Sequence, residues 1–264
     1  MTPQQQTIDI GKRRLAATLQ GSGPPHVLLE VGFGAQASSW SAVAERVSQF
    51  ARVCYYDRAG RGGSDADPIK PRGPGVLVED AHALIHAIDG VAPFIFVGQS
   101  FGGLIGRLLA HRYPNHVAGL VLVDSLHEDQ FETLAPLFPP PSEGEPAMVT
   151  GMRSFWSGGW RDPAQNKEGI DMLACRAAAH AVTSLGDLPV QVLTASSFVH
   201  PPMFARDHAL RLQAKWEELQ SRFTRLSTRA VQQVIPECGH FMQTDKPQVV
   251  VDAIEAMLAD IARA

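Results

Sequence analysis

The chain of 264 residues is predicted to form an α/β fold with a mostly parallel central sheet, helices on both faces and a small helical cap insertion. Two observations predict it. Short apolar runs alternate with longer runs of helical spacing, as in parallel strands joined by helices. One long segment breaks this rhythm and holds a proline run and the aromatic stretch FWSGGW. The core domain is therefore expected at 1–125 and 189–264, and the cap at 126–188.

The expected strands are short runs of aliphatic and aromatic residues, and the expected helices are longer segments of helical spacing. The strands are residues 26–31, 52–56, 94–97, 119–123, 189–194 and 230–235. The helices are residues 40–50, 76–88, 104–112, 207–226 and 247–262. Proline at position 114 closes the third of these helices, because its ring cannot continue one. Ligands of such a sheet bind at the carboxyl ends of its strands.

The composition restricts the partners. The net charge is −4 without a long basic run, which argues against nucleic acid and anionic membranes. The first fourteen residues lack the apolar region of a signal peptide, and no apolar stretch is long enough to span a bilayer. The 3 cysteines lie far apart, which predicts reduced buried thiols in a cytoplasmic protein. A small-molecule substrate and a monomer or homodimer are expected.

The stretch FIFVGQSFGGLIGRLLAHRYP places Ser100 between a run of strand formers and a run of helix formers. A strand that reverses at once into a helix strains the turning residue and requires nearly bare neighbours. Gly98 and Gly102 stand two residues before and after it, which gives the G-x-S-x-G pattern of a nucleophile elbow. A glycine-rich turn with an incidental serine explains the same motif, so the rest of the chain must decide.

Two other chemistries compete with a serine nucleophile. Residues 32–37 form a G-x-G-x-x-A pattern after a strand, and Asp57 ends the next strand, which resembles a dinucleotide-binding fingerprint. The helix starts late for that motif, and a glycine turn that serves another group is the favoured interpretation. His82 and His86 stand at i and i+4 on a helix, but Ala83 occupies the place of the glutamate of a zinc peptidase. No metal site is predicted.

A serine hydroxyl becomes a good nucleophile only when a base removes its proton. Of the 10 histidines, His240 has the best setting, on a loop late in the chain. It follows a strand in the segment ECGHFMQTDKP, with Gly239 freeing the backbone and a final helix beyond. A polar turn histidine is the alternative. Together with the elbow, the pattern favours acyl transfer by Ser100 with His240 as base.

The chain resembles an α/β-hydrolase over essentially its whole length. Four blocks carry the resemblance: VLLEVGFG, YYDRAGRGGSD, VGQSFGG and CGHFMQTDKP. It is closest to bacterial esterase-like serine hydrolases with a YDRAG-type loop and a helical cap. The resemblance implies the α/β-hydrolase fold, Ser100 as nucleophile and His240 as base.

The resemblance also implies an oxyanion hole made by the backbone N–H groups of Phe33 and Phe101. Many members of that family have His-Gly-x in the first loop, where this chain has Val-Gly-Phe, but the donor is a main-chain group. The expected substrate-binding residues are Gly32, Gly34, Trp156 and Trp160, with Phe33 and Phe101 lining an apolar pocket. The tryptophans could equally form the core of the cap. Asp57 and its neighbour Arg58 are expected to organise the turn beside the elbow.

The third member of the triad departs from the commoner family pattern. Members usually carry an aspartate soon after the strand at 189–194, but here ASSFVHPP follows and the next acid is Asp207. A second family arrangement places the acid at the end of the preceding strand, where GLVLVD ends in Asp124. Asp124 is the predicted acid, although a polar strand-end cap is its alternative role. Asp207, expected to be a helix N-cap, Glu128 and Asp129 are the fallbacks.

The predicted function is hydrolysis of a carboxylic ester or lactone of a small to medium apolar substrate through an acyl-enzyme, without a cofactor. A serine nucleophile argues against epoxide hydrolase and dehalogenase chemistry, for which this family uses aspartate. Amidase, carbon–carbon hydrolase and perhydrolase activities use the same triad. A non-catalytic binding protein of the same fold is the remaining alternative.

Overall fold

The computed structural model describes residues 3–24, 26–89, 93–162, 166, 168–200 and 204–263. Within these residues the chain forms an eight-stranded sheet with the order β1-β2-β4-β3-β5-β6-β7-β8. The strands are β1 (Gln4–Asp9), β2 (Arg14–Gln20), β3 (His26–Glu30), β4 (Arg52–Tyr56), β5 (Phe94–Gln99), β6 (Val117–Val123), β7 (Val190–Ala195) and β8 (Ala230–Ile235). From β4 to β8 the neighbours run parallel, and the hairpin β1–β2 adds antiparallel pairs at one edge.

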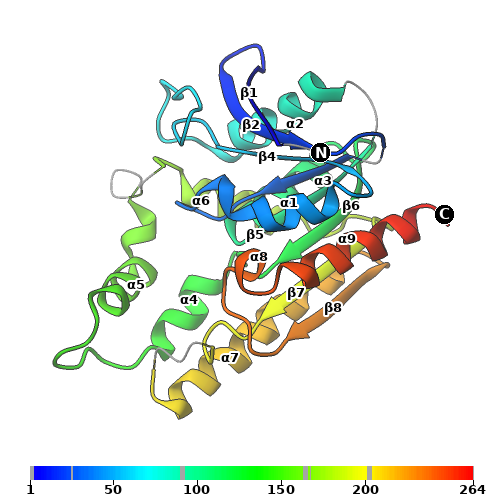
Figure 1. The fold of residues 1–264 in the computed structure, drawn as a ribbon. Coiled ribbons are helices and arrows are strands. Elements are labelled where there is room, and N and C mark those ends of the chain that lie inside the picture. Colours follow the sequence, from blue (N-terminus) through cyan, green and yellow to red (C-terminus); the bar gives the residue numbers. More distant parts are fainter. Residues whose placement is uncertain are drawn as a thin grey trace.

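The α-helices connect these strands and cover the sheet (Figure 1). They are α1 (Ser41–Val47), α2 (Pro74–Asp89), α3 (Phe101–Arg112), α4 (Gln130–Leu134), α5 (Ala147–Ser157), α6 (Met172–Ala181), α7 (Arg206–Ser221), α8 (Met242–Asp245) and α9 (Pro247–Ile261). Short 3₁₀ helices lie at Ala37–Trp40, Ala135–Leu137, Gly159–Arg161 and Arg222–Leu226. None of the helices in the described ranges combines the length and apolarity that crossing a bilayer requires.

Alternation along the strands distributes the core between the two faces of the sheet. In β5, Phe94 and Phe96 pack toward α2, α3 and α6, whereas Ile95 and Val97 pack toward α1 and α9. Both sets are fully buried because successive side chains of a strand point to opposite faces and each face carries helices. The α/β-hydrolase architecture expected from the sequence is confirmed.

The sequence analysis missed β1 and β2, which form the antiparallel edge of the sheet. Strand β1 has the sequence QQQTID and is almost wholly exposed, so it carries no apolar alternation. Its backbone pairs with β2 from Gln4 opposite Leu19 to Asp9 opposite Arg14. Backbone hydrogen bonds to β2 therefore hold β1 in place, whereas Leu15, Ala17 and Leu19 anchor β2 in the core.

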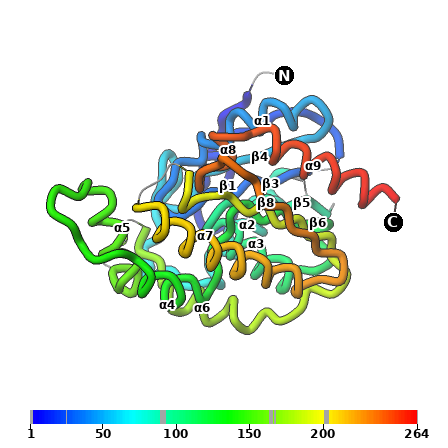
Figure 2. Tube along the Cα trace, turned by 90° about the horizontal axis from the view of Figure 1, so that it is seen from below, coloured from blue at the N-terminus to red at the C-terminus, as the bar shows by residue number. Residues whose placement is uncertain are grey.

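The segment predicted as a cap contains α4, α5 and α6. Figures 1 and 2 both place α4 and α5 at one side of the sheet, away from the C-terminus. Helix α6 instead packs against α2 and α3, and Met172, Cys175 and Ala179 of α6 belong to the core on that face of the sheet. The boundaries 126–188 of a separate cap stay a prediction.

Candidate active site

Ser100 lies in the sharp turn between β5 and α3. Its backbone has φ 53° and ψ −119°, an unfavourable conformation for a residue with a side chain. A Cβ atom on Gly98 would lie 2.4 Å from the carbonyl carbon of Gly102, and one on Gly102 would lie 2.4 Å from the carbonyl oxygen of Glu30. Both positions therefore require glycine, which is the steric reason for the G-x-S-x-G spacing.

Asp124 directly follows β6 and lies next to His240. Its Oδ2 atom is 2.7 Å from Nδ1 of His240, and its side chain is completely buried while that of His240 is 39% exposed. The Asp124 backbone has φ 42°, a region in which aspartate is one of the more tolerated residues. A buried carboxylate so placed can orient the imidazole and balance its charge when it takes a proton.

Both oxygens of Asp124 accept further hydrogen bonds. Oδ1 accepts from the backbone N–H of Ala195 at 2.9 Å and from the indole Nε1–H of Trp216 at 2.7 Å. Oδ2 accepts from the hydroxyl of Ser197 at 2.6 Å as well as facing His240. A buried carboxylate needs such donors, because burial without them would be costly.

The three fallback acids have other surroundings. Glu128 forms an ion pair with Arg107 at 2.7 Å, and Asp129 pairs with His180 at 2.8 Å and Arg222 at 3.3 Å. Asp207 is exposed in the first turn of α7, and the N-cap of that helix is Ala205, so the expected capping role of Asp207 is wrong. The chain enters α7 one residue earlier than the pattern indicated. Within the described residues, none of the three contacts His240.

Two backbone N–H groups of the loop after β3 are paired within the protein. The N–H of Gly32 donates to Oε1 of Gln99 at 3.0 Å, and the N–H of Gly34 donates to Oε1 of Glu168 at 2.6 Å. In the described part of the chain the N–H groups of Phe33 and Phe101 have no hydrogen-bond partner. Those two are the donors expected for an oxyanion. The paired glycine N–H groups, one of them on a carboxylate, also disfavour a pyrophosphate at this loop.

Sequence reasoning missed Gln99, which joins the three parts of the site. Its amide oxygen accepts from Gly32, and its Nε2 donates to the backbone carbonyl of His240 at 3.0 Å. Gln99 is fully buried and directly precedes Ser100. The sequence did offer a signal for Gln99: it is the one polar residue in the strand FIFVGQ, whose other residues are apolar or glycine.

Arg58 holds the loop after β3 in position by hydrogen bonds to its backbone carbonyls. Its guanidinium donates to the carbonyls of Val31 at 2.6 Å and Gly32 at 2.9 Å, and it pairs with Glu30 and Glu168 at 2.6 Å each. Burial lowers the pKa of Arg58, but the two carboxylates outweigh it and raise the pKa above its usual value. For Glu168 the signs are reversed. Burial raises the pKa of its carboxyl group, but the attraction of Arg58 outweighs burial, so the pKa of Glu168 lies below its usual value. Burial raises the pKa of Glu30, and Arg58 and Tyr56 offset this only in part, so the network favours the charged forms of Arg58 and Glu168.

A cavity of about 280 Å³ opens above Ser100. Its walls are mainly aromatic and apolar, and they are formed by Phe33, Ser100, Asp124, Leu126, Gln130, Phe131, Met152, Phe155, Trp156, Met172, Ser197, Phe198, Trp216 and His240. Ser100, Asp124 and His240, far apart in the sequence, share this one cavity. The residues that line the cavity come both from the core domain and from the segment predicted as a cap.

Several residues expected at the pocket lie elsewhere. Trp160 is buried behind Phe131, on which it stacks with ring centroids 4.7 Å apart, and it does not line the cavity. Phe101 is fully buried beside Phe33, in an edge-to-face contact at 6.3 Å. Gly32 and Gly34 are also not among the residues that line the cavity. Their backbone N–H groups instead donate to the side chains of Gln99 and Glu168. Of the two tryptophans expected at the pocket, Trp156 lines the cavity and Trp160 does not, because packing decides which aromatic side chains face it.

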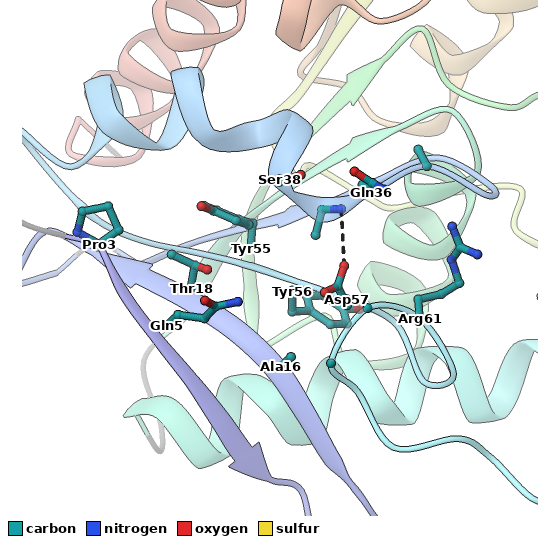
Figure 3. Close-up of a pocket in the computed structure, with 14 residues that line it drawn as sticks. Pro3, Gln5, Ala16, Thr18, Gln36, Ser38, Tyr55, Tyr56, Asp57 and Arg61 are labelled. Carbon is teal, nitrogen blue, oxygen red and sulfur yellow. Dashed lines mark hydrogen bonds between the residues drawn. The ribbon is translucent and has the colours of Figure 1, made fainter.

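A second cavity of about 750 Å³ lies between the β1–β2 hairpin and the loop after β3 (Figure 3). Gln5, Thr18, Tyr55, Asp57 and Arg61 give it a polar wall. Figure 3 shows the bond from the backbone N–H of Ala37 to Oδ1 of Asp57, which is 3.4 Å long. Neither Ser100, Asp124 nor His240 lines this cavity, so it is separate from the candidate active site.

The model of the alpha/beta hydrolase family matches residues 27–253 of the sequence. The chain belongs to this family. Among curated relatives of this hydrolase is the uncharacterized protein YqjL of Bacillus subtilis, 23% identical over 236 residues, which are 89% of this chain and 84% of that protein. The pimeloyl-(acyl-carrier protein) methyl ester esterase of Shewanella sp. (strain MR-7) is 38% identical over 119 residues, 45% of this chain.

The chain covers 41% of the length of that esterase, and only 18% of the length of another match, a probable transporter of Hormonema carpetanum. Among solved structures, a thermophilic esterase from Thermogutta terrifontis superposes with a TM-score of 0.64 at 20% identity, over 98% of this chain and 99% of that one. At that identity the superposition shows the fold of this chain.

Proposed function

We propose that this hydrolase cleaves a carboxylic ester or lactone of a small to medium apolar substrate through an acyl-enzyme, with Ser100, His240 and Asp124 as its triad. The observation that carries the proposal is the contact between Asp124 and His240 in the cavity that Ser100 also lines. Two short bonds from Trp216 and Ser197 hold the carboxylate in place. The family membership and an esterase among the relatives support it.

In the proposed mechanism, the Ser100 hydroxyl attacks the carbonyl carbon while Nε2 of His240 takes its proton. Asp124 holds the other ring nitrogen and stabilises the imidazolium. The N–H groups of Phe33 and Phe101 bind the oxyanion. His240 then protonates the leaving alcohol, and water attacks the acyl-enzyme in a second round.

The size and lining of the cavity support the proposed substrate class. A volume of about 280 Å³ is near the lower end for small-molecule sites, which span about 300–1,000 Å³. Phe131, Phe155 and Trp156 offer ring faces to an apolar acyl or alcohol group. Among the described residues that line it there is no Lys or Arg side chain, which favours an uncharged substrate. A cytoplasmic location and a monomeric or dimeric state stay predictions.

Two measurements test this function. A fluorophosphonate probe should label Ser100, and folded protein that stays unlabelled would favour a binding protein without turnover. A hydrolysis screen over p-nitrophenyl esters of graded chain length, lactones and amides should then give the highest kcat/KM for a short ester or lactone. Amides as the best substrates would contradict the proposed class.

Ser100→Ala should lower kcat by about a million-fold, the effect of losing the nucleophile in a well-studied serine hydrolase. The melting temperature and the circular dichroism spectrum should stay close to those of the wild type, because the hydroxyl makes no structural bond that the cavity requires. Residual activity within about tenfold of wild type would overturn the assignment of Ser100.

A further inference from the structure

Three histidines meet at the edge of the sheet opposite the candidate active site. His82 and His86 lie one turn apart on α2, and His116 lies in the turn directly before β6. Asp124 directly follows the same strand, so the 7 residues of β6, spanning about 20 Å, separate the two sites. The sequence analysis noted His82 and His86 but had no third ligand, because His116 is brought in by tertiary structure alone.

The ring nitrogens of these histidines converge. Nε2 of His82 is 2.8 Å from Nδ1 of His116 and 3.2 Å from Nε2 of His86, and one nitrogen of each ring lies within 4.8 Å of the others. A tetrahedral zinc ion with Zn–N bonds of about 2.0–2.1 Å requires neighbouring nitrogens about 3.3 Å apart. Of the three nitrogen pairs, His82–His86 already matches and His82–His116 needs a shift of about half an ångström. The third pair, His86–His116, lies within 4.8 Å and closes on the ion by rotation of the side chains.

The surroundings keep the cluster in position. Tyr113 stacks on the His82 ring with centroids 3.7 Å apart and an angle of 6° between the planes. Arg112, the nearby cation, is paired with Glu79 at 2.9 Å, which reduces its repulsion of a metal ion.

We propose that His82, His86 and His116 form a binding site for one divalent transition-metal ion, with zinc, nickel and copper as the fitting ions. Imidazole nitrogens are common ligands of these metals, and water would complete the coordination. A stack of metal-free rings is the alternative. In such a stack the hydrogen bonding is incomplete. Nε2 of His82 faces nitrogens of both His86 and His116, but it carries only one proton or one lone pair with which to bond them. A bound metal uses one lone pair from each ring.

A bound ion would fasten α2 to the turn before β6. Since it binds the folded chain and links two elements, it should raise the melting temperature in proportion to the logarithm of its concentration. It lies outside the hydrolytic mechanism, so the site stands or fails independently of the proposed function.

The test is a titration of chelator-treated protein, from which any affinity tag has been removed, with zinc chloride in a calorimeter at neutral pH. One ion should bind per chain and raise the melting temperature. His86→Ala and His116→Ala should each weaken binding by at least about tenfold, since even a lost outer-shell partner costs about 10–100-fold. Cobalt should give a visible absorption spectrum that both substitutions abolish.

His111→Ala is the matched control, because His111 is exposed on α3 and stands outside the cluster. It should bind zinc like the wild type, and so should His240→Ala, which removes the histidine of the candidate active site. The proposal is overturned if the wild type binds no zinc in the calorimeter. It is equally overturned if His86→Ala and His116→Ala bind as tightly as His111→Ala.

Discussion

The loops after β6 and β7 lie side by side at the carboxyl edge of the sheet, and they are stabilised by different chemistry. The loop after β6 carries the charged groups Asp124 and Glu128, and the latter pairs with the buried Arg107 of α3. The loop after β7 carries Ser196 and Ser197 instead. Family members that keep their acid after β7 have a carboxylate there, whereas this chain has hydroxyl donors.

The hydroxyls of the β7 loop support the acid and the histidine from the side. Ser197 donates to Asp124 at 2.6 Å. The Ser196 hydroxyl accepts from the N–H of Cys238 at 2.9 Å and donates to its carbonyl at 3.0 Å, which anchors the loop that carries His240. The comparison teaches that, in the proposed triad with Asp124 as its acid, the β7 loop serves as a source of neutral donors. Its consequences can be tested by changing one loop at a time.

The largest expected effect is on the β6 acid. Asp124→Asn should lower kcat by about ten-thousand-fold, as the equivalent change does in a serine protease, because the amide favours the wrong imidazole tautomer and removes the counter-charge. The measurement is kcat/KM on the best ester of the screen, after the melting temperature has been compared with that of the wild type.

The matched control is Asp207→Asn, which is equally isosteric and lies on an exposed turn after β7. It should be nearly silent. A crippled Asp207→Asn beside an active Asp124→Asn would mean that the acid comes from the β7 side after all, through a rearranged loop.

The next effect concerns folding. Glu128→Gln should destabilise the protein by about 3–5 kcal/mol, because it leaves Arg107, whose side chain is 1% exposed, without its counter-charge. Burial raises the pKa of Glu128, but Arg107 outweighs it and lowers the pKa from 4.5 to about 2. The stabilisation is therefore complete above pH 4.5 and lost as the pH falls toward 2.

Urea unfolding of wild type and Glu128→Gln across the acid range measures this difference. The gap between the two free energies of unfolding should narrow as the pH falls through the pKa of Glu128. A gap that stays constant with pH would show that the ion pair does not stabilise the β6 loop.

The smallest effect is expected at the donors around Asp124. Trp216→Phe keeps the ring and removes one hydrogen bond to a charged acceptor, worth about 1.5–3 kcal/mol. We expect kcat to fall by about 10–100-fold with little change in KM, and the pH profile of kcat to shift, because Trp216 acts through the carboxylate. Ser197→Ala should cost less, since that residue is partly exposed. A change confined to KM would instead assign Trp216 to substrate contact.

Much of the fold and half of the site followed from local patterns. The six predicted strands all coincide with observed strands, because runs such as Phe94–Val97 are buried on both faces and must be apolar throughout. The position of Ser100 followed from the glycines around it, since steric conflict in a tight turn acts between neighbours in sequence. The edge strand β1 was missed because an exposed strand has no hydrophobic signature.

The sequence by itself determined where six of the eight described strands, the helices α1, α2, α3, α7 and α9 and the elbow lie, because apolar periodicity and glycine spacing act over a few residues. Only the tertiary structure decided that Asp124 rather than Glu128 faces His240, that Gln99 ties Gly32 to His240, and that His116 joins the histidines of α2. These partners are separated by many residues. Sheet order and helix packing bring them together, and a distance of 3 Å or less between such groups has no counterpart in the local sequence.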